Sequence, residues 1–321
     1  MWSISPTLVR RTAVASLVAN VVIVITGGAV RLTGSGLGCP TWPRCTDDSY
    51  TSTPEMGLHG VIEFGNRTLS MIVGLIAIAA LVAAISARPR RRDLTWLAMT
   101  VVILVGVQGV IGGLSVRFQL NPWVVAGHFT MSMVVIAFGY ALWSRAPGPV
   151  TRHEEVARAG RTDVHPAGLP RELRWLTAGI AATTLAVLAV GTVVTGSGPH
   201  AGDPDSERIA IDPGLIAQIH ADLVFLLLGL SIAGWFAIRA TAPGSSAARA
   251  ATLLVAAELA QGGIGFVQYF TALPVLLVGL HMAGACMVWL AALHLYATTH
   301  QPAGTAVTTE PNDRAIPVPA G

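Results

Sequence analysis

Residues 94–115 read LTWLAMTVVILVGVQGVIGGLS and contain no charged side chain. When helical, a run of roughly 20 apolar residues crosses the ~30 Å hydrocarbon core of a bilayer. Further runs of this kind lie at 12–30, 61–87, 122–144, 174–195, 214–238, 250–270 and 274–296. The chain is 53% hydrophobic and only 12% charged, whereas soluble domains carry about 25% charged residues. These features predict an all-α integral membrane protein with eight transmembrane helices.

The basic residues predict how these helices are oriented. All 20 are arginines, and most lie in the N-terminus, in 88–92, 145–174 and 239–249, and in the C-terminal tail. The positive-inside rule therefore places both termini in the cytoplasm of a multi-pass protein of the cell membrane. We interpret the basic run 88–92 as a topology signal, so we expect membrane lipid but no nucleic acid as a partner. The first span has no A-x-A-like cleavage site, so we expect it to stay in the membrane.

A sequence repeat divides the chain into two similar halves. The motif Gln108-Gly109-Val110-Ile111-Gly112 recurs as Gln261-Gly262-Gly263-Ile264-Gly265, and the same offset of 153 residues carries His128 to His281. Gly34-Ser35-Gly36, after the first span, recurs as Gly196-Ser197-Gly198 after the fifth. Each copy holds four spans, so both copies enter the membrane from the same side. We predict two tandem four-helix bundles related by a pseudo-two-fold axis along the membrane normal.

The predicted units follow from this repeat. An N-terminal four-helix unit covers 1–144 and a C-terminal unit covers 174–296. A cytoplasmic linker rich in Pro, Gly, Arg and Glu joins them at 145–173. We expect a disordered cytoplasmic tail at 297–321, because this segment has few apolar residues. The repeated glutamines are interpreted as interhelical hydrogen-bonding groups rather than as ligands.

Three histidines lie at a similar depth in the predicted membrane. His128, His220 and His281 are each about five to seven residues inside the outer end of an apolar span, which is roughly 10 Å. A polar side chain at this depth usually faces a bundle interior or a functional cavity. Paired imidazoles suit a six-coordinate haem iron, and no Cys-His or carboxylate cluster has the spacing of a zinc site. We predict a bis-histidine haem held by His220 and His281. Solvated or interfacial roles are expected for the remaining histidines: His153, His165, His200, His294 and His300.

The N-terminal half lacks one of these histidines. Aligning residues 62–66 with 216–220 places Asn66 opposite His220. His59, Glu63 and Asn66 are spaced by four and then three residues, so in a helix they share one face, and Glu63 reaches Arg67 four residues on. A carboxylate at the mouth of an apolar bundle indicates either a function or an ion pair that tethers the outer loop. We predict that one half keeps a permanent cofactor while the other handles a substrate.

Two cysteines lie in the first outer loop. Cys39 and Cys45 enclose Pro40, Trp42 and Pro43. A disulfide is permitted on the outer side of a bacterial-type membrane. Two interpretations stay open, a structural staple and a redox-active pair that accepts reducing equivalents. Cys286, within the last span, is expected to be inert packing.

These motifs together resemble a known family, haem A synthase, which oxidises a methyl group of haem O to a formyl group. The resemblance rests on Gly34-Ser35-Gly36-Leu37-Gly38-Cys39, on Trp42-Pro43-Arg44-Cys45, on Ile62-Glu63-Phe64 and on histidines in the fourth, sixth and eighth spans. It covers the chain from the first span to the last. It implies haem b in the C-terminal half, haem O in the N-terminal half and two successive oxygen-dependent hydroxylations of one methyl carbon.

The resemblance also implies roles for individual residues. His220 and His281 correspond to the haem b ligands, His128 to a ligand of the substrate haem and Glu63 to the catalytic carboxylate. Cys39 and Cys45 match the family's loop cysteine pair.

One position departs from the family pattern, because family members usually carry histidine where this chain has Asn66, immediately before Arg67. Either partial unwinding of the helix near Gly57 and Gly60 brings His59 inward as the replacement ligand, or His128 alone holds the substrate haem.

Two other functions fit the same residues. A di-haem b cytochrome would pass electrons from quinol without substrate chemistry, and a haem-binding chaperone or transporter would act without redox turnover. An electron carrier needs two complete ligand sets, so Asn66 and Glu63 favour the enzyme. The resemblance implies haem O synthase as a partner, and a homo-oligomer is an open alternative.

Overall fold

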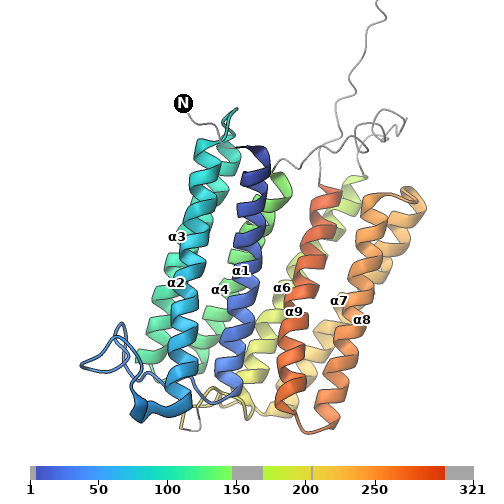
Figure 1. The fold of residues 1–321 in the computed structure, drawn as a ribbon. Helices are drawn as coiled ribbons and strands as arrows, with labels where there is room; N and C mark the ends of the chain where they lie inside the picture. Colours follow the sequence, from blue (N-terminus) through green and yellow to red (C-terminus); the bar gives the residue numbers. More distant parts are fainter. Residues whose placement is uncertain (1–4, 147–168, 204, 301–321) are drawn as a thin grey trace, which may run out of the picture.

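The computed structural model describes residues 5–146, 169–203 and 205–300 (Figure 1). Eight helices in these ranges are long and apolar enough to cross a membrane. They are α1 (Pro6–Leu32), α2 (Gly57–Ser86), α3 (Arg92–Arg117), α4 (Pro122–Arg145), α6 (Arg171–Ser197), α7 (Pro213–Thr241), α8 (Ser246–Phe270) and α9 (Val275–Thr299), and a short 3-10 helix, η1 (Pro54–Met56), precedes α2. The predicted all-helical membrane fold and its eight spans are confirmed.

Short polar side chains cap the starts of several helices. Each cap accepts a hydrogen bond from a backbone N–H in the first helical turn, which would otherwise have no partner within the helix. Proline follows three of the caps directly, where its missing N–H is not needed. The capping residues are Ser5, Asn121, Asp212 and Ser245. These signals let the chain stop and restart helices between runs that are almost continuously apolar.

The two halves use the same tight turn between their last two helices. Gln119 and Leu120 join α3 to α4 with φ of 49° and 57°, and Ala272 and Leu273 join α8 to α9 with φ of 60° and 59°. Left-handed conformations cost L-residues roughly 1–2 kcal/mol each. The same unfavourable pair recurs at the 153-residue offset found in the sequence, so the repeat extends to backbone conformation.

The helices form two neighbouring groups of four, α1–α4 and α6–α9 (Figure 1). In the first group α1 and α3 each contact α2 and α4, and in the second α6 and α8 each contact α7 and α9. Within the part of the chain that the structure describes, no Cα atoms of α2 and α4, or of α7 and α9, lie within 8 Å of each other. These pairs therefore stand at opposite corners of their groups, and side chains that point inward from them face a common interior.

The two groups meet along α1, α4, α6 and α9. Contacts join α1 to α9, α4 to α6 and α4 to α9. A two-fold axis that exchanges α1 with α6 and α4 with α9 would generate this set of contacts, although the symmetry itself and the division into units stay predictions. Most of the predicted linker 145–173 and of the tail 297–321 lies outside the described residues.

The outward surface of the helices is apolar. Leu75 on α2 and Phe236 on α7 are 66% and 62% exposed. Exposing apolar side chains along whole helices is unfavourable in water but not in the hydrocarbon core of a bilayer. Small residues such as Ala80 and Ala84 are instead buried where helices pack closely. Hydrocarbon is thus the solvent that this surface fits.

Candidate functional site

In the C-terminal group, His220 and His281 lie on α7 and α9, the helices at opposite corners. Both side chains are half-buried, and their Nδ1 atoms are buried without a hydrogen-bond partner among the described residues. A buried polar atom without a partner is unfavourable by about 1–3 kcal/mol. Two such atoms in one bundle indicate a binding site for a ligand that is not part of the described chain.

Glycines lie beside these two imidazoles. A Cβ added at Gly191 would lie 3.1 Å from Cε1 of His220, and one added at Gly265 would lie 3.2 Å from Cε1 of His281. Both distances are shorter than the ~3.5–4.0 Å of an ordinary carbon contact. Each imidazole ring therefore packs directly against a glycine, and a side chain at that glycine would clash with the ring. Two half-buried imidazoles that pack against glycines on opposite helices of one bundle fit the axial ligands of a haem.

The repeated glutamines hold the chain at two histidines. Gln261 Nε2 donates a hydrogen bond to the backbone oxygen of His281 at 2.7 Å, and Gln108 Nε2 donates to that of His128 at 3.1 Å. These bonds join α8 to α9 and α3 to α4. They confirm the interpretation of the glutamines as interhelical hydrogen-bonding groups and show that the repeat preserves side-chain geometry.

The N-terminal group has only half of this arrangement. His128 on α4 has a buried Nδ1 atom without a partner in the described chain, and a Cβ at Gly112 would lie 3.4 Å from its Cε1. On α2, at the opposite corner, Asn66 Oδ1 accepts a hydrogen bond from Thr26 Oγ1 at 2.8 Å. Asn66 is therefore engaged with α1, and the interior between α2 and α4 has one imidazole where the other bundle has two.

A buried carboxylate lies one turn outward from Asn66. Glu63 is 5% exposed, and its Oε1 accepts hydrogen bonds from Arg67 Nη2 at 2.5 Å and Nε at 2.9 Å. Its Oε2 accepts a hydrogen bond from the backbone N–H of Cys39. The predicted contact between Glu63 and Arg67 is confirmed, and both carboxylate oxygens are held in fixed positions.

The same ion pair anchors the loop between α1 and η1. Arg67 also donates hydrogen bonds to the backbone oxygens of Cys39 at 3.0 Å and Arg44 at 3.1 Å. Cys39 and Cys45 form a disulfide with their Cα atoms 4.5 Å apart, and both are fully buried. The loop is therefore closed on itself and fastened to α2 beside Glu63. A structural role for the disulfide fits this arrangement, and a redox role stays an alternative.

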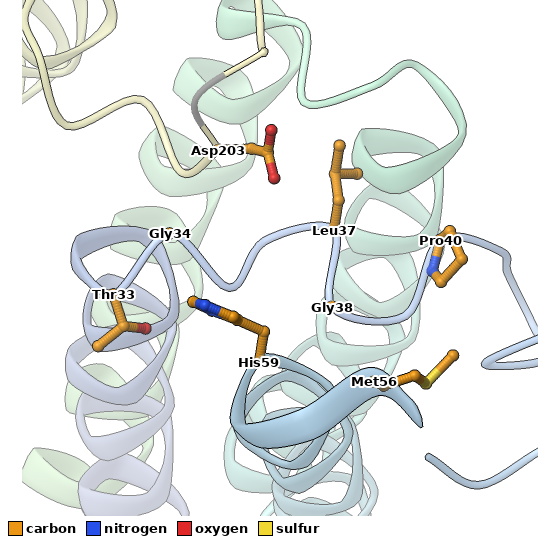
Figure 2. A pocket seen from close by; sticks show the side chains of 8 residues that line it. All are labelled: Thr33, Gly34, Leu37, Gly38, Pro40, Met56, His59 and Asp203. Carbon is orange, nitrogen blue, oxygen red and sulfur yellow. The ribbon is translucent and has the colours of Figure 1, made fainter. Parts of the chain in front are cut away.

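His59 lies at the start of α2, at the end of the helix groups that carries the loop between α1 and α2. Its Nδ1 atom is 2.9 Å from Ser35 Oγ, and its side chain is exposed. It lines a pocket of about 520 Å³; Figure 2 shows its ring turned toward the end of α1, with Asp203 on the far side. Because α2 is helical from Gly57, His59 is about 10 Å outward from Asn66, and the unwinding that would bring it inward is absent from this conformation.

The remaining histidines in the described ranges have protein partners. His294 Nδ1 is 2.8 Å from Tyr140 Oη, which links α9 to α4, and His300 Nδ1 is 2.9 Å from the backbone oxygen of Tyr296. His200 Nε2 is 3.0 Å from the backbone oxygen of Leu273. His153 and His165 lie outside the described residues. Cys286 is a free, fully buried cysteine.

Several site residues were not expected from the sequence. Gly191 beside His220 has no counterpart in the repeat, because the offset of 162 places Ala29 at that position. Thr26, which bonds Asn66, belongs to no motif, and Ser35 belongs to the repeated Gly34-Ser35-Gly36 motif, which gave no sign of its contact with His59. Glu258 on α8 is also buried; its Oε1 accepts a hydrogen bond from Ser231 Oγ at 2.8 Å. An acidic residue inside an apolar run was the available signal for it.

Comparison with known proteins agrees with this geometry. Residues 10–293 match the family model COX15-CtaA, described as cytochrome oxidase assembly protein. The chain belongs to this family. The match runs from α1 to α9, so it includes both helix groups and the loop at Glu63. The sequence-based identification of the family is thereby confirmed.

Curated relatives in the same family carry the name Heme A synthase. The relative from Methylobacterium sp. (strain 4-46) is 25% identical over 334 residues, covering 87% of this chain and 89% of that protein. The relative from Symbiobacterium thermophilum is 30% identical over 186 residues, 58% of each chain. The one from Exiguobacterium sibiricum is 31% identical over 117 residues, 36% of this chain and 39% of that protein. In these last two, the match spans about two fifths to three fifths of the relative's length.

Proposed function

We propose that this protein is a haem A synthase, which oxidises one methyl group of haem O to a formyl group with haem b as resident cofactor. The observation that carries the proposal is the inequality of the two bundles. One bundle offers two half-buried imidazoles, on α7 and α9. The other offers His128 alone, with Glu63 buried nearby. An electron carrier with two equivalent haems would need the same ligands in both bundles, so the difference favours a cofactor in one and a substrate in the other.

In the C-terminal bundle, His220 and His281 are the residues that would hold haem b. Their Nδ1 atoms have no partner among the described residues, and Gly191 and Gly265 leave room for the rings. Bound there, haem b supplies one-electron transfer. Gln261 donates a hydrogen bond to the backbone oxygen of His281 and so holds in place the backbone of a residue that would bind the iron.

In the N-terminal bundle, His128 would hold the iron of haem O. Gly112 and Gln108 surround it as Gly265 and Gln261 surround His281. Asn66 occupies the position of the second ligand but is bonded to Thr26. An open position on the substrate haem is what oxygen chemistry requires. We therefore propose that His128 is the protein's ligand to the substrate, with His59 as the alternative to be tested.

The reaction proceeds through two hydroxylations of one methyl carbon. Each consumes one O₂, two electrons and two protons and releases one water, and the resulting hydrate loses a further water to give the aldehyde. The electrons come from a donor outside this chain. The Glu63 carboxylate, held by Arg67 and by the Cys39 amide, is placed to exchange protons with this half or to stabilise a positive charge that develops there.

The test is the haem composition of membranes from a host that makes haem O but lacks haem A synthase. With the wild-type chain, extracted haem should include haem A, and the purified protein should contain haem b. Glu63→Gln should abolish haem A while haem b remains. Glu172→Gln is the matched control, because Glu172 is exposed in the first turn of α6. Two equivalents of haem b without haem A formation would identify an electron carrier and overturn the proposal.

His59→Ala, made in the same host, separates the two ligand alternatives. If His128 alone holds the substrate, haem A formation should fall less than about twofold, because His59 contacts Ser35 at the outer surface. Loss of haem A with retention of haem b would assign His59 the missing ligand role. In either case the protein is proposed to lie in the plasma membrane with both termini cytoplasmic and to receive haem O from haem O synthase.

A further inference from the structure

Arg31 is a half-buried cation that forms no ion pair with an acidic residue in the described ranges. It lies in the last turn of α1, and its Nε donates a hydrogen bond to the backbone oxygen of His200 at 2.6 Å. The ion pairs that the described residues form are Glu63–Arg67 and Arg91–Asp93, so Arg31 belongs to neither. Withdrawing a guanidinium from water without a counter-charge is unfavourable. Such a group indicates an anion that the described residues do not provide.

A second cation lies close to the first. Arg208 and Arg31 donate hydrogen bonds to the backbone oxygens of consecutive residues, Pro199 and His200. Arg208 is anchored by its own loop, because Nη1 donates to the backbone oxygen of Ser206 at 3.0 Å and Nη2 to that of Pro199 at 3.4 Å. Two neighbouring guanidinium groups repel each other unless an anion lies between or beside them. The outer ends of the two bundles therefore share a positive site at their junction.

The position of Arg31 relates this site to one particular bundle. Arg31 follows Gly28 by three residues, so the two lie on one face of α1. A Cβ at Gly28 would lie 2.6 Å from Met282 Cε, and one at Gly279 would lie 3.3 Å from Leu32 Cδ1. This face therefore packs against α9 at residues 279–282, around His281. The side chain of Arg31 points toward the α6–α7 connection, because its Nε bonds to His200 there. Its guanidinium therefore lies closer to that connection than His281 does.

We propose that Arg31, supported by Arg208, binds a propionate carboxylate of the haem held by His220 and His281. This inference rests on the proposed function, because it needs a haem in the C-terminal bundle. A haem carries two carboxylates on one edge, beyond the iron. Arginine binds carboxylates through parallel N–H···O bonds, and the bond to His200 uses only Nε of Arg31, leaving both Nη groups for the ligand.

The experiment removes the charge from each partner in turn. Wild type, Arg31→Gln, Arg31→Lys and Arg117→Gln are produced in full length in a haem-deficient host and loaded with haem b or with haem b dimethyl ester. Arg117 is the matched control, since it also lies in the last turn of a helix at the outer side but is exposed. Binding is followed by the low-spin absorption band of the bis-histidine haem.

The wild type should bind haem b about tenfold or more tightly than its dimethyl ester, as expected for loss of a charge-assisted hydrogen bond. Arg31→Gln should weaken haem b binding by a similar factor and remove the preference over the ester. Arg31→Lys should restore part of it, and Arg117→Gln should behave as wild type. The reduction potential of the haem should fall in Arg31→Gln, because a positive charge that favours the reduced iron has been removed.

If Arg31→Gln keeps the wild-type preference for haem b over the ester, Arg31 does not bind the carboxylate, and its anion is of another kind, such as a lipid phosphate. If the wild type binds no haem b at all, the proposed function fails instead. Thermal unfolding of the unloaded variants identifies any that fail to fold, and Arg31→Lys keeps the test decisive in that case. The two failures are therefore distinguishable in one set of measurements.

Discussion

Gly265→Ala places a methyl group against the His281 imidazole, and its effect can be worked out from the structure. The new carbon would lie 3.2 Å from Cε1 and 3.7 Å from Nδ1 of His281, so the ring must move by a few tenths of an ångström to reach the ~3.5–4.0 Å of normal contact. Overpacking of this kind costs roughly 1–3 kcal/mol. Expressed as affinity, that is about a 5- to 150-fold loss of haem b binding.

Alanine substitutions at other glycines form a series in which the expected loss of haem binding is graded, and one of them serves as a control. A Cβ at Gly191 would lie 3.1 Å from His220 Cε1, and one at Gly112 would lie 3.4 Å from His128 Cε1. Haem b loss should be greatest for Gly191→Ala and Gly265→Ala, whereas Gly112→Ala should act weakly and only on the substrate. Gly262→Ala has no atom of another residue within 4 Å of its Cβ beyond the local helix. It should therefore bind haem b normally, with a slight gain in helix stability of up to about 1 kcal/mol.

The assay is the ratio of haem b to protein after purification, together with the low-spin spectrum and titration of the unloaded protein with haem b. The ratio should fall in the order Gly262, Gly265, Gly191, with the spectrum broadened where the ring is displaced. Wild-type affinity in both Gly265→Ala and Gly191→Ala would refute the reasoning, because it would mean that these imidazoles are not the groups that bind the iron.

Three further perturbations test other parts of the structure. Cys45→Ser opens a loop whose ends are six residues apart and should reduce loop stability by about 2 kcal/mol. The yield of haem A should fall while haem b is retained. An unchanged yield of haem A would show that Glu63 does not need the closed loop. Tyr140→Phe removes the bond to His294 and should lower stability by about 1 kcal/mol in thermal unfolding, without a change in haem content. Glu258→Gln replaces a carboxylate by an uncharged amide that keeps the bond from its serine partner, so the melting temperature should not fall; a clear decrease would mean that the charge itself is used.

Much of the fold follows from local features of the sequence. Apolar runs of spanning length predict the eight helices because in hydrocarbon the backbone must satisfy its hydrogen bonds within each segment. The helix ends extend beyond the predicted spans, as at Pro6 and Thr241, because helices continue past the apolar region into the interface. The repeat predicts the matched environments of His128 and His281, since the same glutamine and glycine recur at a fixed offset.

Other parts of the site depend on contacts that no local pattern encodes. Asn66 has a clear place in the alignment, but its bond to Thr26 depends on how α1 packs against α2. Gly191 clears space for His220 from a different helix, and the repeat does not include it. The backbone amide of Cys39 reaches Glu63 only because the outer loop folds back, and main-chain groups leave no signature in the sequence.

The outer end of α1 also has a consequence for the order in which the protein is made. The backbone N–H of Gly36 bonds to the oxygen of Gly202 at 3.0 Å, and Arg31 bonds to His200. Both acceptors belong to the connection between α6 and α7, so they leave the ribosome only after all of α1–α4 has been synthesised. The N-terminal group is thus synthesised before the segment that contacts this end of α1. Completion of this end therefore awaits a loop that the chain encodes in its second half.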